Sequence, residues 1–256
     1  MKIISISLQK GGSAKTTTAV NLAANLAARK RRVLLIDMDS QANATFSSGV
    51  NSRDLENSLY NVLTPDSRYK CSIRDAIIRT DFFDLIPADR DVADLSDELK
   101  SATALRNVLQ TVSNLYDFVI LDTPPALNII SQNALAAADY VIIPAEPRPF
   151  NFTGMVDLRD SIEAVRASHN PKLMVLGILL VKHNQRTNLT KTVQDLITDY
   201  AAQLGTSVYA ATIREAVAVP ESQLAQKPLI YYAKSAKPTI DYKAFTTETL
   251  KRMGEI

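Results

Sequence analysis

Paired glycines, lysines and threonines stand together near the N-terminus, and these are the residue types that bind a phosphate chain. The stretch reads Gln9-Lys10-Gly11-Gly12-Ser13-Ala14-Lys15-Thr16-Thr17. Gly11 and Gly12 let the backbone turn tightly and bring its N–H groups close to an anion. At this spacing Lys15 can reach the β- and γ-phosphates of a nucleotide, and the Thr16 hydroxyl can ligate Mg²⁺. We therefore expect residues 11–17 to bind the phosphates of a nucleotide together with Mg²⁺.

Carboxylates end two apolar runs further along the chain. Val33–Ile36 runs into Asp37 and Asp39, and Phe118–Leu121 runs into Asp122. An apolar run that ends in aspartate is typical of a buried strand that delivers a carboxylate to Mg²⁺ beside a phosphate-binding loop. This pattern predicts that Asp122 supports the metal.

The elements that must position these residues alternate along the chain. Short β-rich runs lie at Ile3–Leu8, Val33–Ile36, Phe83–Ile86, Phe118–Leu121, Tyr140–Ile143 and Leu173–Val181. Helical patterns lie at Thr16–Arg29, 101–114, 127–138, 152–168 and 187–203, and a terminal helix begins around Thr239. Strands that are apolar throughout indicate a sheet covered on both faces, and strand–helix alternation indicates parallel pairing. The expected fold is therefore α/β, a doubly wound and mostly parallel sheet, in a single domain over residues 1–256.

The pattern Lys-Gly-Gly-x-x-Lys-Thr-Thr resembles the deviant Walker A motif of the ParA/MinD group of P-loop ATPases. The resemblance implies that Lys10 crosses a nucleotide-sandwich homodimer to touch the partner's phosphates, so that Lys10, Lys15 and Asp39 are the catalytic residues. The segment from Asp37 to Thr45 resembles the family's Asp-x-Asp-Pro-Gln-x-Asn segment, with Ser40 in place of proline. By that resemblance Asp39 orients the attacking water, and Asp37 supports Mg²⁺ and its waters.

Ala14 departs from this pattern, because the family usually has glycine directly before the second lysine. Glycine spares the backbone a Cβ near the phosphates and tolerates a positive φ. If Ala14 has to be left-handed, the strain is on the order of 1 kcal/mol, which would weaken ATP binding up to ~10-fold.

Shorter resemblances extend over most of the chain. Asp122-Thr123-Pro124-Pro125 is similar to the family's switch II, and Pro144-Ala145-Glu146-Pro147 to a turn that follows a later strand. Asn184–Leu189 and Ile213–Val217 resemble two segments that carry the family's DNA-contacting arginines, which would fall at Arg186 and Arg214. Each arginine taken alone is as well explained as a surface salt-bridge partner.

Composition excludes several classes of protein. The 256 residues are 46% hydrophobic and 22% charged, as in ordinary globular chains, and no run is long enough to span a membrane. Cys71 is the single cysteine, which excludes a cysteine-held metal cluster such as that of a nitrogenase-iron-protein relative. The tyrosine cluster of a related tyrosine kinase is also missing from the terminus. We expect a cytoplasmic protein that has no signal peptide.

Charge is distributed unevenly along the chain. Residues 51–100 hold eleven acids against seven bases, whereas residues 182–256 hold ten bases against seven acids. The excess of bases in the C-terminal part hints at a face that binds a polyanion, although a solvated surface gives similar counts.

The resemblance implies a ParA-type partition ATPase of the short form, which has no operator-binding extension before the first strand. The ATP-bound homodimer would bind duplex DNA without sequence preference on the nucleoid, and a ParB-type partner would stimulate hydrolysis. The alternative is a MinD-like membrane-cycling regulator of cell division. That alternative requires a C-terminal amphipathic helix with bulky apolar residues, whereas residues 242–256 carry few bulky residues and three threonines. We therefore expect no membrane partner.

Overall fold

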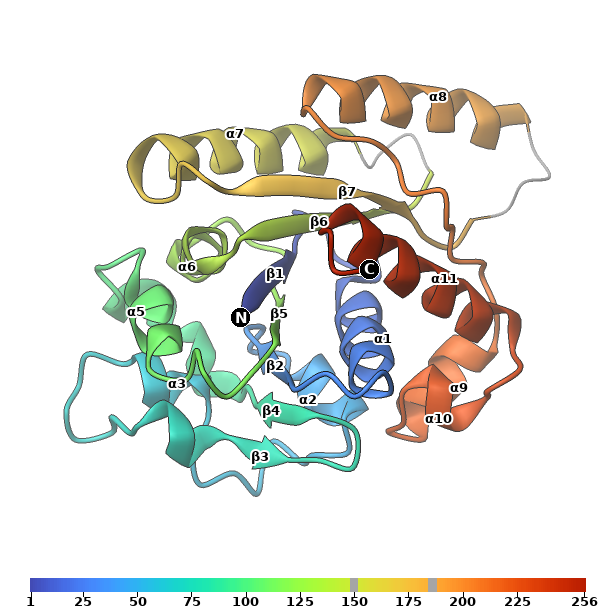
Figure 1. Cartoon of the computed structure of the whole chain (residues 1–256). Helices are drawn as coiled ribbons and strands as arrows, with labels where there is room; N and C mark the ends of the chain where they lie inside the picture. Colours follow the sequence, from blue (N-terminus) through green and yellow to red (C-terminus); the bar gives the residue numbers. More distant parts are fainter. Residues whose placement is uncertain (148–151, 184–187) are drawn as a thin grey trace.

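One sheet of seven strands organises the computed structural model, which describes residues 1–147, 152–183 and 188–256 (Figure 1). The strand order is β3-β4-β2-β5-β1-β6-β7, and every neighbouring pair is parallel except β3 with β4. The strands are β1 Lys2–Ile6, β2 Val33–Asp37, β3 Ile78–Arg79, β4 Asp84–Ile86, β5 Phe118–Asp122, β6 Tyr140–Ala145 and β7 Met174–Leu180. The predicted α/β fold with a mostly parallel sheet is confirmed.

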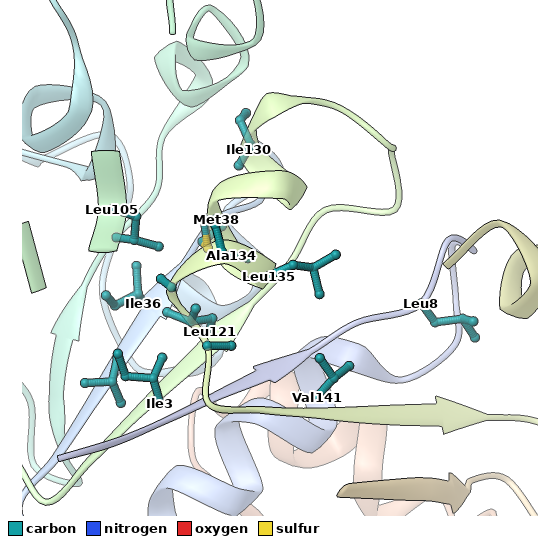
Figure 2. Packing of buried hydrophobic residues seen from close by; sticks show 14 of the residues in the cluster. Ile3, Leu8, Ile36, Met38, Leu105, Leu121, Ile130, Ala134, Leu135 and Val141 are labelled. Atoms are coloured by element: carbon teal, nitrogen blue, oxygen red, sulfur yellow. The ribbon is translucent and has the colours of Figure 1, made fainter. Parts of the chain in front are cut away.

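Both faces of the sheet are buried, which explains why its strands are apolar throughout. In β5 the side chains of Val119 and Leu121 enter one core, whereas Phe118 and Ile120 enter the other. This alternation follows from the two-residue period of a strand. Figure 2 shows the first core, where Leu121 lies with residues of β2 and helix α6.

Helices cover the two faces of the sheet as two layers. The first core is completed by α3 Leu59–Leu63, α4 Leu95–Glu98, α5 Ala104–Gln110, α6 Ile129–Ala137, α7 Phe152–Ser168 and α8 Asn188–Gln203. The second is completed by α1 Lys15–Ala27, α10 Leu229–Tyr232 and α11 Lys237–Arg252, with the short helices α2 Asn43–Ser47 and α9 Ala218–Leu224 beside them. Two 3₁₀ helices lie at Ile73–Ala76 and Arg90–Ala93. No helix in the described ranges is both long and apolar enough to cross a bilayer.

The terminal helix α11 packs against α1, so the C-terminal helix and the helix that follows the phosphate loop share one layer. Tyr242 and Phe245 are buried there, and the Tyr242 hydroxyl lies 3.3 Å from the Thr18 hydroxyl. The helix begins at Lys237, two residues before the expected start, because Ala236 is the last extended residue and Pro238 occupies its first turn.

The sheet brings the ends of three strands together on one edge. β5 lies between β1 and β2, and the register pairs Asp122 with Ile6 on one side and with Asp37 on the other. Because all three strands are parallel, the segments that follow them leave the sheet on the same side. The phosphate-binding stretch and the two predicted metal-supporting carboxylates therefore meet at that edge.

Candidate nucleotide site

The loop between β1 and α1 has the backbone of a phosphate-binding turn. Gly12 and Ala14 both have positive φ, 73° and 62° respectively, and Ala14 is the residue from which α1 starts. The left-handed conformation considered for Ala14 from the sequence is therefore present. An alanine in this conformation costs on the order of 1 kcal/mol more than glycine. The loop keeps this geometry despite the strain, which indicates that the surrounding contacts hold it.

Two lysines hold carbonyl groups of this loop. The Lys15 Nζ donates to the Lys10 carbonyl at 2.8 Å, and the Ser13 hydroxyl donates to the same oxygen at 3.1 Å. The Lys182 Nζ, which follows β7, donates to the Gly12 carbonyl at 2.8 Å. The sequence pattern pointed to Lys15 but not to Lys182, because Lys182 lies far along the chain from the loop that it contacts.

Lys15 and Lys10 differ in burial. Lys15 is 7% exposed and lines the cavity, and burial lowers the pKa of its ammonium while the nearby charges of Asp122 and Asp39 raise it. Lys10 is half-buried, and its side chain is not part of the cavity lining. The two lysines of the motif therefore differ in place: Lys15 belongs to the cavity lining and Lys10 does not.

Asp122 is a buried carboxylate whose two oxygens accept no hydrogen bond from any described residue. Its side chain is 1% exposed, and burial together with the charge of Asp37 raises its pKa well above the ordinary value, although the nearby Thr16 hydroxyl and Lys15 ammonium pull the pKa down. An orphaned buried carboxylate is costly unless a cation or donor completes it. The donor set formed by Asp122 and the half-buried Thr16 hydroxyl suits a hard cation such as Mg²⁺.

Asp37 is equally buried but fully hydrogen-bonded. The Thr45 N–H and the Thr45 hydroxyl both donate to its Oδ2 at 2.8 Å, and the Asp39 N–H donates to Oδ1 at 3.2 Å. Burial raises the pKa of Asp37 to about 6, although these donors pull it down. Thr45 lies in the first turn of α2, and Ala42, from which α2 starts, has no side chain that can cap it. Asp37 therefore supplies the missing cap and shapes the loop that carries Asp39.

Asp39 stands in that loop at the border of the cavity. It is half-buried and lines the cavity, and its Oδ1 accepts the Gln41 N–H at 3.0 Å. This turn fixes one carboxylate oxygen against the backbone. The structure thus brings together most of the predicted residues of the N-terminal half: residues 11–17 and Asp39 line one cavity, and Asp37 and Asp122 are buried at the ends of the neighbouring strands, whereas Lys10 is not part of the cavity lining.

The cavity has a volume of about 1200 Å³, which is ample for a nucleotide. A further part of the cavity lining comes from residues within 213–224, between β7 and α10. There Val217 and Leu224 are 71% and 78% exposed, and the Gln223 amide donates to the Thr17 hydroxyl at 3.0 Å. Sequence reasoning had not assigned this wall, since exposed apolar residues in a short helix carry no distinctive spacing.

The two arginines predicted to contact DNA have different outcomes. Arg186 lies outside the described residues. Arg214 lines the cavity and makes a bidentate ion pair with Asp241 of α11, with Nη2···Oδ1 2.6 Å and Nε···Oδ2 2.9 Å. This pair raises the pKa of the guanidinium further and ties the cavity wall to α11. The salt-bridge alternative for Arg214 is therefore present in the structure, while its role toward DNA stays a prediction.

Comparison with known proteins agrees with this site. A family model described as an AAA domain matches residues 1–175, so the chain belongs to this family of P-loop ATPases. Its relatives include the chromosome-partitioning ATPase Soj of Thermus thermophilus, 36% identical over 253 residues, which cover 98% of this chain and 96% of Soj. The chromosome partitioning protein ParA of Caulobacter vibrioides is 34% identical over 260 residues, covering 98% and 95%. The chain is thus a member of the ParA/Soj family of partitioning ATPases.

A solved structure supports the same fold. Cobyrinic acid a,c-diamide synthase from Mycobacterium smegmatis, with bound ADP and magnesium, superposes with a TM-score of 0.83 at 30% identity. The match covers 99% of this chain and 96% of that chain. The resemblance to the ParA/MinD group that the sequence motifs indicated is confirmed.

Proposed function

We propose that this chain is an ATP-dependent DNA partition protein that acts as an ATP-bridged homodimer on the nucleoid. The single observation that carries the proposal is the different placement of the two loop lysines. Lys15 is buried and lines the cavity, whereas Lys10 is half-buried and does not line it. We assign Lys15 to the nucleotide of its own subunit and Lys10 to the nucleotide of the partner subunit. The names of the relatives Soj and ParA support the same role.

Within the site we assign Thr16 and Asp122 to Mg²⁺, with Asp37 supporting its waters. The neighbouring synthase structure binds ADP with magnesium, and the orphaned carboxylate of Asp122 fits such an ion. The metal supplies charge neutralisation on the phosphate oxygens. The carboxylate of Asp39 orients the attacking water, and its own turn with Gln41 holds it in place. The ammonium of Lys15 stabilises the charge that develops on the phosphates.

DNA binding is assigned to the basic surface of the C-terminal part. Lys227, Lys234 and Lys237 are exposed there, and the Arg214 Nη2 donates to the Lys237 carbonyl at 3.4 Å. Asp241 takes the Nε and Nη2 donors of Arg214, and a guanidinium has five N–H donors, so the Nη1 edge can still donate to a phosphate. A ParB-type partner would stimulate hydrolysis and release the DNA.

The MinD-like alternative gains no support from α11. Its large apolar residues Tyr242, Phe245 and Leu250 are packed into the core and at most 2% exposed, and Ile240 is the one large apolar side chain of the helix that is exposed, at 53%. A helix whose apolar face is already packed has little left to insert into a bilayer. Sedimentation with anionic liposomes and ATP is expected to leave the protein in the supernatant, and ATP-dependent pelleting would favour the alternative.

The proposal is tested by analytical sedimentation with ATP, ADP or no nucleotide, each with and without random duplex DNA. We expect a dimer with ATP alone and a larger complex when DNA is added. Lys10→Ala should bind nucleotide as a monomer but fail to dimerise, whereas the exposed-site control Lys172→Ala should behave as wild type. A Lys10→Ala protein that still dimerises with ATP would remove the cross-subunit role.

Asp241→Asn tests the DNA assignment without removing Arg214. The substitution frees the guanidinium from its carboxylate partner, so affinity for random duplex DNA should rise and its salt dependence should steepen. A loss of DNA affinity with dimerisation intact would instead show that Arg214 serves the fold and not the DNA surface.

A further inference from the structure

Lys182 links three segments that are distant in sequence. Its backbone stands directly after β7 and Val181, its Nζ donates to the Gly12 carbonyl at 2.8 Å, and the same Nζ lies 3.8 Å from Glu146 Oε2. Glu146 follows β6, and its side chain is only 13% exposed. The ammonium group therefore connects the ends of two neighbouring strands to the phosphate loop.

The hydrogen bond from Lys182 to the Gly12 carbonyl fixes the orientation of the whole Gly12–Ser13 peptide group. A peptide group is planar and trans, so its C=O and the following N–H point in opposite directions. When Lys182 holds the Gly12 oxygen on one side, the Ser13 N–H is held on the other. Backbone N–H groups of such a loop are its anion-binding elements. Lys15 acts on the Lys10 carbonyl in the same way, which fixes the orientation of the Gly11 N–H.

The backbone at Lys182 indicates that the side chain matters here. Lys182 has φ 50°, a left-handed conformation that glycine or asparagine adopts with less strain. A strained residue with a long cationic side chain persists where its contacts compensate, and the contacts of Lys182 are those to Gly12 and Glu146.

We propose that Lys182 is a positioning residue of the nucleotide site: its ammonium, oriented by Glu146, holds the Gly12–Ser13 peptide so that the loop presents its N–H groups to the phosphates. This inference rests on the nucleotide site of the proposed function and adds to it a residue from the far end of the sheet. It acts through the loop backbone, so its loss affects ADP and ATP alike.

The test is the affinity of Lys182→Met for Mg-ADP and Mg-ATP, measured by isothermal titration calorimetry. Loss of one charge-assisted hydrogen bond should weaken both nucleotides about tenfold. Lys182→Arg keeps a donor and should recover most of the affinity, whereas the exposed-site control Lys172→Met should bind as wild type. Equal affinity of Lys182→Met and wild type would overturn the proposal.

A second readout uses the protein without nucleotide. Amide hydrogen exchange of residues 11–16 should be faster in Lys182→Met than in wild type, and unchanged in Lys172→Met. Lys182→Asn covers the case in which methionine destabilises the left-handed position, because asparagine tolerates that conformation and still removes the amine. Unchanged exchange in both variants would overturn the positioning role. Failure of the wild-type protein to bind any nucleotide, with exchange still faster in the variants, would refute the proposed function and not this contact.

Glu146→Gln measures whether the ion pair between Lys182 and Glu146 contributes to nucleotide binding. It should weaken Mg-ADP binding about threefold, and the effect should disappear in the Lys182→Met background because both changes act through one contact. Fully additive effects would show that Glu146 acts elsewhere.

Discussion

Asp37 and Asp122 pair with each other across β2 and β5 and are both buried, yet their carboxylates have opposite surroundings. Three donors from Thr45 and Asp39 satisfy Asp37, whereas Asp122 has no hydrogen-bond partner among the described residues. A satisfied carboxylate fixes local structure, and an orphaned one is available to a cation. Two aspartates at paired strand ends can therefore act differently: Asp37 shapes the loop beside the waters of the proposed metal, and Asp122 is left available to the metal itself.

The largest effect is expected at Asp39, the residue carried by the loop that Asp37 shapes. Asp39→Ala should lower the rate of ATP hydrolysis about 10²- to 10⁴-fold, because orienting water matters in the transition state. The dissociation constant for ATP should stay within about twofold, since ground-state binding uses other groups. Single-turnover hydrolysis and equilibrium binding measure the two quantities. Asp97→Ala, on an exposed position of α4, is the matched control.

Asp122→Asn tests the contribution of the carboxylate that we assign to the metal, while the rest of the site stays unchanged. Hydrolysis should fall about 100-fold, because the charge that the carboxylate offers to Mg²⁺ is lost. Without nucleotide or metal, the variant should be more stable than wild type by about 1 kcal/mol, because a costly buried carboxylate is removed. Urea unfolding in EDTA measures this difference. A destabilised variant would show that Asp122 has a structural partner.

Asp37→Asn makes the same substitution at the carboxylate that is fully hydrogen-bonded. The amide keeps one acceptor but turns an NH₂ group toward the donors of Thr45 and Asp39, so the fold should lose about 1–3 kcal/mol. Hydrolysis should fall less than in Asp122→Asn when measured well below the melting temperature. Opposite signs of the two stability changes would sharpen the contrast between the carboxylates, and equal signs would remove it.

Elements and site residues were predicted best where a residue type at a fixed spacing has a single known structural or chemical role. The strands β1, β2 and β5 and the helix α1 were predicted to within a few residues, because their apolar runs and the glycine pair are local signals. The two-residue strand β3 and the short helices α2 and α9 were not predicted. Each is too short to show a period, and tertiary contacts such as the Asp37–Thr45 bonds hold α2 in place.

The same distinction applies to the site. Residues 11–17 and Asp39 are recognisable as a contiguous motif, and they line the cavity as expected. Lys182 and Gln223 reach the site only through folding, since each contacts a residue more than 150 positions away. The different surroundings of Asp37 and Asp122 could not be read from the sequence either, because hydrogen-bond partners depend on the loop conformation.

The smallest effect is expected at Ala14. It concerns whether the strain of the phosphate loop lowers the stability of the fold or the affinity for nucleotide. The expectation from sequence was weaker ATP binding. In the folded chain, however, Ala14 is already left-handed, in a loop held by internal bonds from Lys15 and Lys182. The strain therefore belongs to the fold, so that relieving it should raise the free energy of unfolding more than it tightens binding.

Ala14→Gly should accordingly stabilise the protein by about 0.5–1 kcal/mol, since glycine tolerates positive φ at little steric cost. The dissociation constant for ADP should change less than about threefold, a difference well under 1 kcal/mol. Thermal unfolding and calorimetric titration measure the two effects. Ala28→Gly is the matched control: Ala28 has φ −61° at the other end of α1, so glycine there relieves no strain and should destabilise. A tenfold gain in affinity without a gain in stability would show that the loop is strained by the nucleotide and not by the fold.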